Sequence, residues 1–111
     1  MNINNGGQVT ISNSSFDHCQ ANIGGGGIYV QIELGGKLTI DGQCNFTECN
    51  TFYSGGGIYT SISGLNSLLV LDDGVKFGSC LSDSNDNYGG GGLYLKAWNQ
   101  GTGIINKVQL D

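Results

Sequence analysis

Two adjacent carboxylates are the clearest candidates for acid-base chemistry in this sequence of 111 residues. Asp72 and Asp73 stand side by side, and like charges this close can raise the pKa of one partner. Glycoside hydrolysis needs one acid and one base or nucleophile at a defined separation. The pair directly precedes Gly74, however, where aspartate is an ordinary turn residue. Arginine is absent and the one histidine, His18, has no recognisable acid-base partner, so we expect no enzymatic activity.

A polar segment near the C-terminal third offers oxygen ligands for calcium. Its candidate ligands are Asp83, Asn85, Asp86 and Asn87. The calcium loop of an EF-hand is not matched, because Tyr88 stands where the loop glycine belongs and no Glu follows at the twelfth position. We therefore interpret the segment as a solvated turn, and we expect no metal or other cofactor.

Four cysteines allow two interpretations, and both remain open. Cys44 and Cys49 stand five residues apart with no nearby His, which fits no zinc pattern. Cys19, Cys49 and Cys80 each follow a phenylalanine by three residues, which favours small buried side chains in one repeated position. The alternative is a disulfide in an oxidising compartment, either between neighbouring repeats or between Cys44 and Cys49, which the spacing of adjacent strands permits.

The cysteines belong to a motif that occurs three times. Each copy has Phe-x-x-Cys, then a run of glycines, then an aliphatic residue and tyrosine. The phenylalanines recur after 30 and 31 residues, at positions 16, 46 and 77. A fixed period in this range indicates a repeat architecture. The repeats run approximately over 8–36, 37–67 and 68–106, with a partial unit at 107–111.

Alternating apolar residues predict β-strands within each repeat. Val9 and Ile11 share one face of such a strand, as do Leu38 and Ile40. We therefore predict an all-β fold: a single-domain parallel β-helix of about three and a half coils of roughly 30 residues. Stacked coils should form an internal aromatic column, an aliphatic column and an exposed tyrosine column. These are Phe16, Phe46 and Phe77; Ile28, Ile58 and Leu93; and Tyr29, Tyr59 and Tyr94.

The glycine runs predict tight corners where the coil turns. Gly accepts φ > 0 and allows close backbone approach. The expected corner residues are Gly26, Gly27, Gly56, Gly57, Gly91 and Gly92. A phosphate-binding loop would need a following Lys-Ser/Thr or a helix start, and neither is present.

Segments 31–36, 61–66 and 96–106 differ between the repeats and are expected to be loops. Loops of this kind often carry binding residues. Trp98 falls in the last of them, where it could stack on a sugar or cover the end of the coil.

Composition excludes several classes of partner. The net charge is −5, with four lysines and no arginine, so neither nucleic acid nor an anionic lipid surface is an expected partner. No apolar run has the length of a transmembrane helix and no signal peptide is visible. Because the chain begins and ends inside a repeat, we expect a fragment of a longer protein. Asn13 and Asn45 begin N-glycosylation sequons, which matter only in a eukaryotic secretory pathway.

The repeated motif resembles the Phe-x-x-Asn and Gly-Gly-Ala-Ile repeats of chlamydial polymorphic outer-membrane proteins. The resemblance rests on the three phenylalanines and on Gly26-Gly27-Ile28, Gly56-Gly57-Ile58 and Gly91-Gly92-Leu93. It implies a right-handed parallel β-helix with a secreted or surface-displayed, adhesin-like role. The chain departs from that pattern, because cysteine stands where the family usually has Asn, and Gly replaces Ala.

We therefore expect a non-enzymatic structural or adhesin-like protein at the cell surface or outside the cell. Its expected partners are itself, other surface proteins or glycans. A second hypothesis is a filament subunit that stacks end to end through unpaired strand edges. A third is a fragment of a polysaccharide lyase or hydrolase, a chemistry that β-helices also support.

Overall fold

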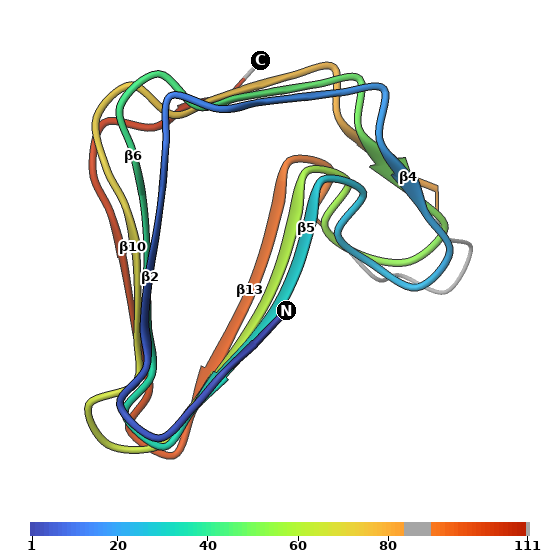
Figure 1. Ribbon diagram of the computed structural model, residues 1–111. Helices are drawn as coiled ribbons and strands as arrows, with labels where there is room; N and C mark the ends of the chain where they lie inside the picture. Colours follow the sequence, from blue (N-terminus) through green and yellow to red (C-terminus); the bar gives the residue numbers. More distant parts are fainter. Residues whose placement is uncertain (84–89, 111) are drawn as a thin grey trace.

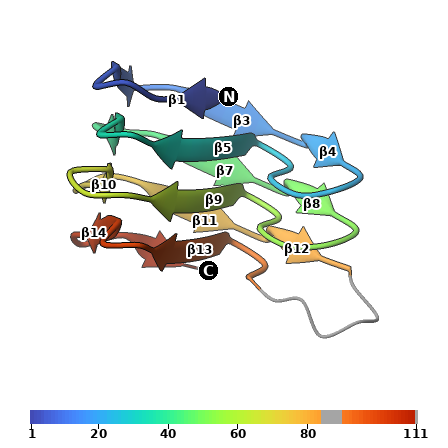
Figure 2. The ribbon, with the colours of Figure 1, turned by 90° about the horizontal axis from the view of Figure 1, so that it is seen from below.

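The chain winds into a parallel β-solenoid of about three turns, which confirms the predicted all-β fold (Figure 1). The computed structural model describes residues 1–83 and 90–110. Strands stack along the solenoid axis into parallel sheets, as Figure 2 shows from the side. Alternation places the apolar side chains of each strand on the inward face of the coil. There they pack against one another and against the equivalent residues of the neighbouring coils.

In the described parts of the chain, four sheets form the walls of the solenoid. Sheet A contains β1 (Asn2–Ile3), β5 (Ile28–Glu33), β9 (Ile58–Ser63) and β13 (Leu93–Trp98). Sheet B contains β2 (Gln8–Ser12), β6 (Lys37–Asp41), β10 (Leu68–Leu71) and β14 (Thr102–Ile105). Sheet C contains β3 (Ser15–Asp17), β7 (Asn45–Thr47), β11 (Lys76–Gly78) and β15 (Gln109–Leu110). Sheet D contains β4 (Gln20–Ala21), β8 (Asn50–Thr51) and β12 (Leu81–Ser82).

Equivalent residues of successive coils lie opposite one another. In sheet B, Val9 pairs with Leu38 and Leu38 with Leu69. The inward positions of the middle coils are fully buried, and Leu38 and Leu69 are each 0% exposed. The core is therefore a set of apolar columns that run parallel to the solenoid axis.

The fourth coil begins at a different residue from the one predicted. β14 pairs with β10 in sheet B, so Thr102–Ile105 is the counterpart of Leu68–Leu71. The partial unit expected at 107–111 instead places Gln109 opposite Lys76, in sheet C. The prediction was wrong because Lys107-Val108-Gln109-Leu110 has the same apolar alternation as a sheet B strand, and alternation alone does not specify which strand of the coil it is.

The segments expected to be loops are largely strand. The ends of β5, β9 and β13 extend through residues 33, 63 and 98, and the connections to sheet B are short turns. In two of these turns, Gly36 N donates to Glu33 O at 3.0 Å and Gly101 N donates to Trp98 O at 2.9 Å. The expected insertions at 31–36, 61–66 and 96–106 are therefore much smaller than predicted.

At the glycine corners, one glycine adopts a positive φ and a different glycine provides room for the neighbouring coil. Gly25, Gly55 and Gly90 have positive φ, whereas none of the six glycines expected at the corners does. Gly26 is needed for space, because a Cβ there would lie 2.4 Å from the carbonyl oxygen of Gly56 in the next coil. The turn thus depends on the preceding glycine, and the following glycines permit close stacking of the coils.

The end strands of sheets A and B, β13 and β14, exchange a large residue for a small one. Leu95 pairs with Thr60, which pairs with Val30 in the inward column of sheet A. Gly103 stands opposite Leu69 in sheet B, and a Cβ there would lie 2.6 Å from Leu95 Cδ1. The leucine side chain therefore extends across to the space that a side chain at position 103 would need.

Candidate functional site

The phenylalanines of the repeat stack in one internal column. The ring centroids of Phe16 and Phe46 are 4.7 Å apart, and those of Phe46 and Phe77 are 4.9 Å apart. Phe46 is 0% and Phe77 2% exposed, while Phe16 is half-buried in the first coil. The aliphatic residues Ile28, Ile58 and Leu93 are paired in register in sheet A. These columns fill the interior of the solenoid among the described residues.

The repeated cysteines lie just after the phenylalanines, and their thiols bond to backbone. Cys49 Sγ donates to the carbonyl of Phe16 at 3.2 Å, and Cys80 Sγ donates to the carbonyl of Phe46 at 3.2 Å. Cys49 is fully buried, whereas Cys19 and Cys80 are half-buried. Burial raises the pKa of Cys49 to about 11, with a further contribution from the neighbouring Cys80 and Cys19. Cys49 is therefore a protonated, poorly nucleophilic thiol at neutral pH.

All four cysteines are free thiols in this structure. Cys44 is buried, and its Sγ donates to the carbonyl of Asp41 at 3.1 Å rather than bonding to Cys49. Of the two interpretations of the cysteines, the geometry matches the one in which they are small core residues.

An exposed cluster around His18 is absent from the sequence-based candidates. His18 Nδ1 lies 2.7 Å from Asp17 Oδ1, and its Nε2 contacts Glu48 Oε2 of the next coil. His18 and Glu48 occupy the same place before a repeated cysteine, with φ of 55° and 52°. The expectation that His18 has no acidic partner was therefore wrong, because its partner lies one coil away. Aligning the repeats would have placed Glu48 beside it.

The other candidates for acid-base or metal chemistry lie in turns. Asp72 Oδ1 accepts a hydrogen bond from the backbone N of Asp73 at 2.8 Å, which is the local bonding of an ordinary Asp turn. Of the four proposed calcium ligands only Asp83 is described, as an exposed residue after β12, and Asn85, Asp86 and Asn87 lie outside the described residues. Within the described part of the chain, no cluster of three His, Cys, Asp or Glu could hold a metal ion.

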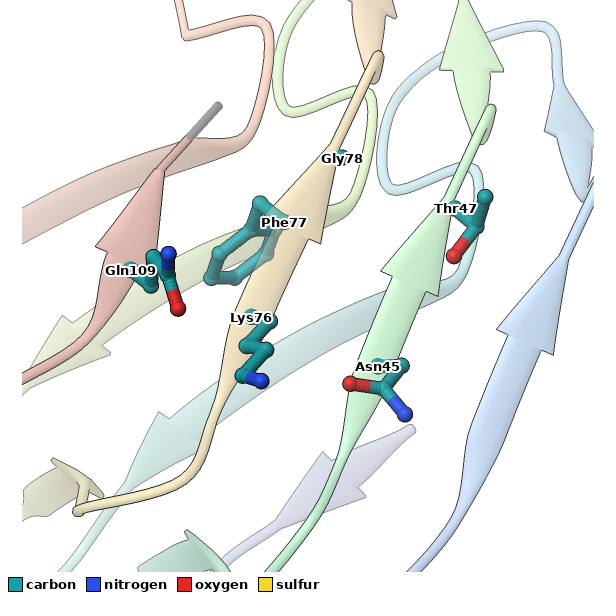
Figure 3. Close-up of a pocket in the computed structure, with 6 residues that line it drawn as sticks. All are labelled: Asn45, Thr47, Lys76, Phe77, Gly78 and Gln109. Atoms are coloured by element: carbon teal, nitrogen blue, oxygen red, sulfur yellow. The ribbon is translucent and has the colours of Figure 1, made fainter.

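The two sequon asparagines differ in their surroundings. Asn13 is exposed, and its Oδ1 accepts a hydrogen bond from Gln43 N at 3.1 Å. Asn45 is half-buried on β7, beside a shallow pocket on the outer surface of sheet C (Figure 3). The pocket is lined by Asn45, Thr47, Lys76, Phe77, Gly78 and Gln109. The single charge in this lining is Lys76, so the described residues there offer no acid-base pair.

A second aromatic column lies on the outer face of sheet A. Tyr29, Tyr59 and Tyr94 are half-buried and stacked, with centroid separations of 4.7 and 5.0 Å. Burial raises the pKa of Tyr59, and the flanking tyrosines raise it further. The tyrosine column is thus less exposed than the sequence suggested, because the corner between sheets D and A folds over it.

That corner and the tyrosines enclose a groove, which we call the tyrosine groove. In Figure 1 the chain between β4 and β5 bends into an elbow beside the start of β5. Gly24 of this elbow lies against Tyr59, since a Cβ on the glycine would be 3.1 Å from the tyrosine ring. The groove is lined by Ile23, Tyr29, Tyr53, Ser54, Tyr59, Tyr94 and Lys96.

Trp98 lies at the end of β13 and is half exposed rather than placed in a loop. Lys96 Nζ sits 5.4 Å from its ring centroid, a cation–π distance. The indole Nε1 donates to Ser61 Oγ at 3.5 Å. Trp98 therefore extends the aromatic surface of sheet A away from the tyrosine groove.

Comparison of the chain with protein-family models, curated proteins and solved structures finds no match. The β-solenoid fold is therefore established by the structure alone. Among the described residues, no helix has the length and apolar character to cross a membrane.

Proposed function

We propose that this chain is a non-enzymatic structural module of an extracellular or cell-surface protein, with adhesin-like contacts made by its outer faces. The observation that carries this proposal is the filled interior of stacked columns. Phe46, Leu38 and Leu69 of the middle coils are completely buried. A close-packed interior of this kind resists deformation, which suits a stiff spacer. Polar and aromatic groups that could contact a partner lie on the outside.

The repeat pattern supports display at a surface. Three in-phase copies of Phe-x-x-Cys and Gly-Gly-aliphatic resemble the repeats of the polymorphic outer-membrane proteins, whose role is at the cell surface. A β-solenoid suits that role because its outer faces present the same kinds of residue at regular intervals. On this proposal the partners are other surface proteins or glycans.

Antibodies raised against the purified chain test the location. We expect them to label intact cells that carry the protein, and we expect protease added to those cells to remove the signal. Labelling that requires permeabilised cells would overturn the proposal. An antibody against a known internal protein of the same cells serves as the control for integrity.

A second candidate function is a filament subunit, and the contrast between middle and end coils favours it. Phe46 is 0% exposed, whereas Phe16 at one end is only half-buried, and Ile105 at the other end is 51% exposed. Such ends offer unpaired strand edges to another copy. Electron microscopy of the purified chain at increasing concentration tests this candidate. Filaments with an axial repeat built from steps of about 4.8 Å support it, and uniform small particles at every concentration contradict it.

A further inference from the structure

We propose that the tyrosine groove binds a neutral linear polysaccharide whose chain runs parallel to the solenoid axis. This inference deepens the adhesin-like function above and rests on it, since it names the class of ligand that one outer face would take. The groove lies on a side face of the solenoid, and at one end it reaches Tyr94 and Lys96 of the end strand β13.

The spacing of the tyrosines indicates a periodic ligand. The rings of Tyr29 and Tyr59 are 4.7 Å apart with a 4° interplanar angle, and those of Tyr59 and Tyr94 are 5.0 Å apart with a 9° angle. Because the rings are nearly parallel, their phenol groups repeat along the axis at about the same interval. A polymer with a similar spacing of units can place one unit at each rung, as an extended β-linked sugar chain does with its rings.

The lining of the groove has the mixed character that a sugar requires. The tyrosine and Ser54 hydroxyls both donate and accept hydrogen bonds. Ile23 and the half-exposed Tyr53 supply an apolar wall from the corner. A sugar ring has apolar C–H faces and a rim of hydroxyls, so it can contact both kinds of surface. Aromatic side chains with a polar end are suited to such contacts.

The overall charge of the protein favours a neutral sugar chain over an acidic one, because a net charge of −5 repels polyanions. Among the described residues that line the groove, Lys96 carries the one charge, and the rest of the lining is uncharged.

The backbone of sheet A argues against a peptide that binds as an added strand. β5 pairs with β9, and β9 pairs with β13, along all six residues of each strand. Strand addition requires an unpaired sheet edge, which in sheet A lies along the end strand β13 and faces along the solenoid axis. The outer face that carries the tyrosines presents side chains instead. A ligand in this groove must therefore be recognised through side chains, as a polysaccharide is.

Calorimetric titration of the purified chain with neutral β-1,4-linked oligosaccharides tests the proposal. The probes are cello-, xylo- and N-acetylchito-oligosaccharides from dimer to hexamer, with an oligogalacturonate series as the acidic comparison. We expect at least one neutral series to bind, with affinity that rises with length until all three tyrosine rungs are spanned and then levels off. No binding by any neutral series, affinity that does not depend on length, or tighter binding of the acidic series would overturn the proposal.

Two variants locate the binding. Tyr59→Phe keeps the ring stack and removes the central hydroxyl, so we expect affinity to fall about fivefold, as for loss of one hydrogen bond. Thr39→Val is the matched control, because Thr39 is a half-buried outward residue of the middle coils on sheet B. Unchanged affinity in Tyr59→Phe, or an equal loss in Thr39→Val, would place binding elsewhere. Surface labelling together with absence of sugar binding would overturn the groove proposal and leave the surface role intact.

Discussion

Two aromatic columns of this protein have nearly the same geometry and opposite surroundings. The phenylalanine rings are 4.7 and 4.9 Å apart inside the solenoid, and the tyrosine rings are 4.7 and 5.0 Å apart on its outer face. The match follows from the strand spacing, which places equivalent residues of successive coils at about 4.8 Å. Stacking is therefore imposed by the backbone register, and burial decides how much each column contributes to stability.

The largest expected effect is on the inner column. Phe46→Ala should lower the free energy of unfolding by about 3–5 kcal/mol, because Phe46 is fully buried between two stacked rings. Urea unfolding followed by circular dichroism measures it. A near-zero change in the unfolding midpoint would show that the inner column does not hold the coils together.

A second prediction concerns how the free energy of unfolding depends on pH through the buried thiol of Cys49, next to the inner column. The pKa of Cys49 in the folded protein is about 11, above the ordinary 9.0, so folding favours the protonated thiol. The resulting stability is fully present below pH 9 and is lost as the pH rises through 11. At about 1.4 kcal/mol per pH unit, the loss is roughly 2–3 kcal/mol.

Urea unfolding of the protein and of Cys49→Ser between pH 8 and 11 measures this loss. Serine can still donate to the Phe16 carbonyl but does not titrate in this range, so the variant should lose less stability on going to high pH. Cys44→Ser, at a buried position outside this column, is the control. Parallel pH curves for the protein and Cys49→Ser would contradict the prediction.

The outer column should respond more weakly to the same kind of truncation. Tyr59→Ala is expected to cost about 1–2 kcal/mol, because the half-buried ring removes only part of its apolar surface from water. The comparison with Phe46→Ala in the same urea assay is the measurement. Equal losses would mean that the tyrosines are part of the core and that the distinction between the two columns fails.

The smallest effect has the opposite sign. Thr60 lies between Val30 and Leu95 in an inward column, is 0% exposed, and its hydroxyl has no hydrogen-bond partner among the described residues. Thr60→Val should raise the free energy of unfolding by about 1 kcal/mol, because it removes an unsatisfied buried hydroxyl. Thr39→Val, at a half-buried outward position, should change stability by less. A fall in the melting temperature of Thr60→Val would indicate an unseen partner for the hydroxyl.

The columns could be predicted because the repeat period and the apolar alternation can both be read from the order of residues in the sequence. Phe16, Phe46 and Phe77 could be aligned without knowing the path of the chain between them. The contact of His18 with Glu48 was missed, since it depends on which turn residues face each other across coils. The start of the fourth coil was assigned to the wrong residue, because the strands of sheets B and C in one coil have the same apolar alternation.

The tyrosine groove could not be predicted from the sequence, because it requires the elbow at Gly24 to fold back on Tyr59.

The exchange of size between Leu95 and Gly103 bears on how such a chain can change in length. Coils that carry like residues in every column could be duplicated or removed as whole units, because each interface would be replaced by an equivalent one. The end strands β13 and β14 lack this freedom, because Leu95 occupies the space that a side chain at position 103 would need. A coil that placed a larger residue at the position of Gly103 would clash with Leu95. Duplication or exchange of coils at this end therefore requires that the leucine and the glycine stay together.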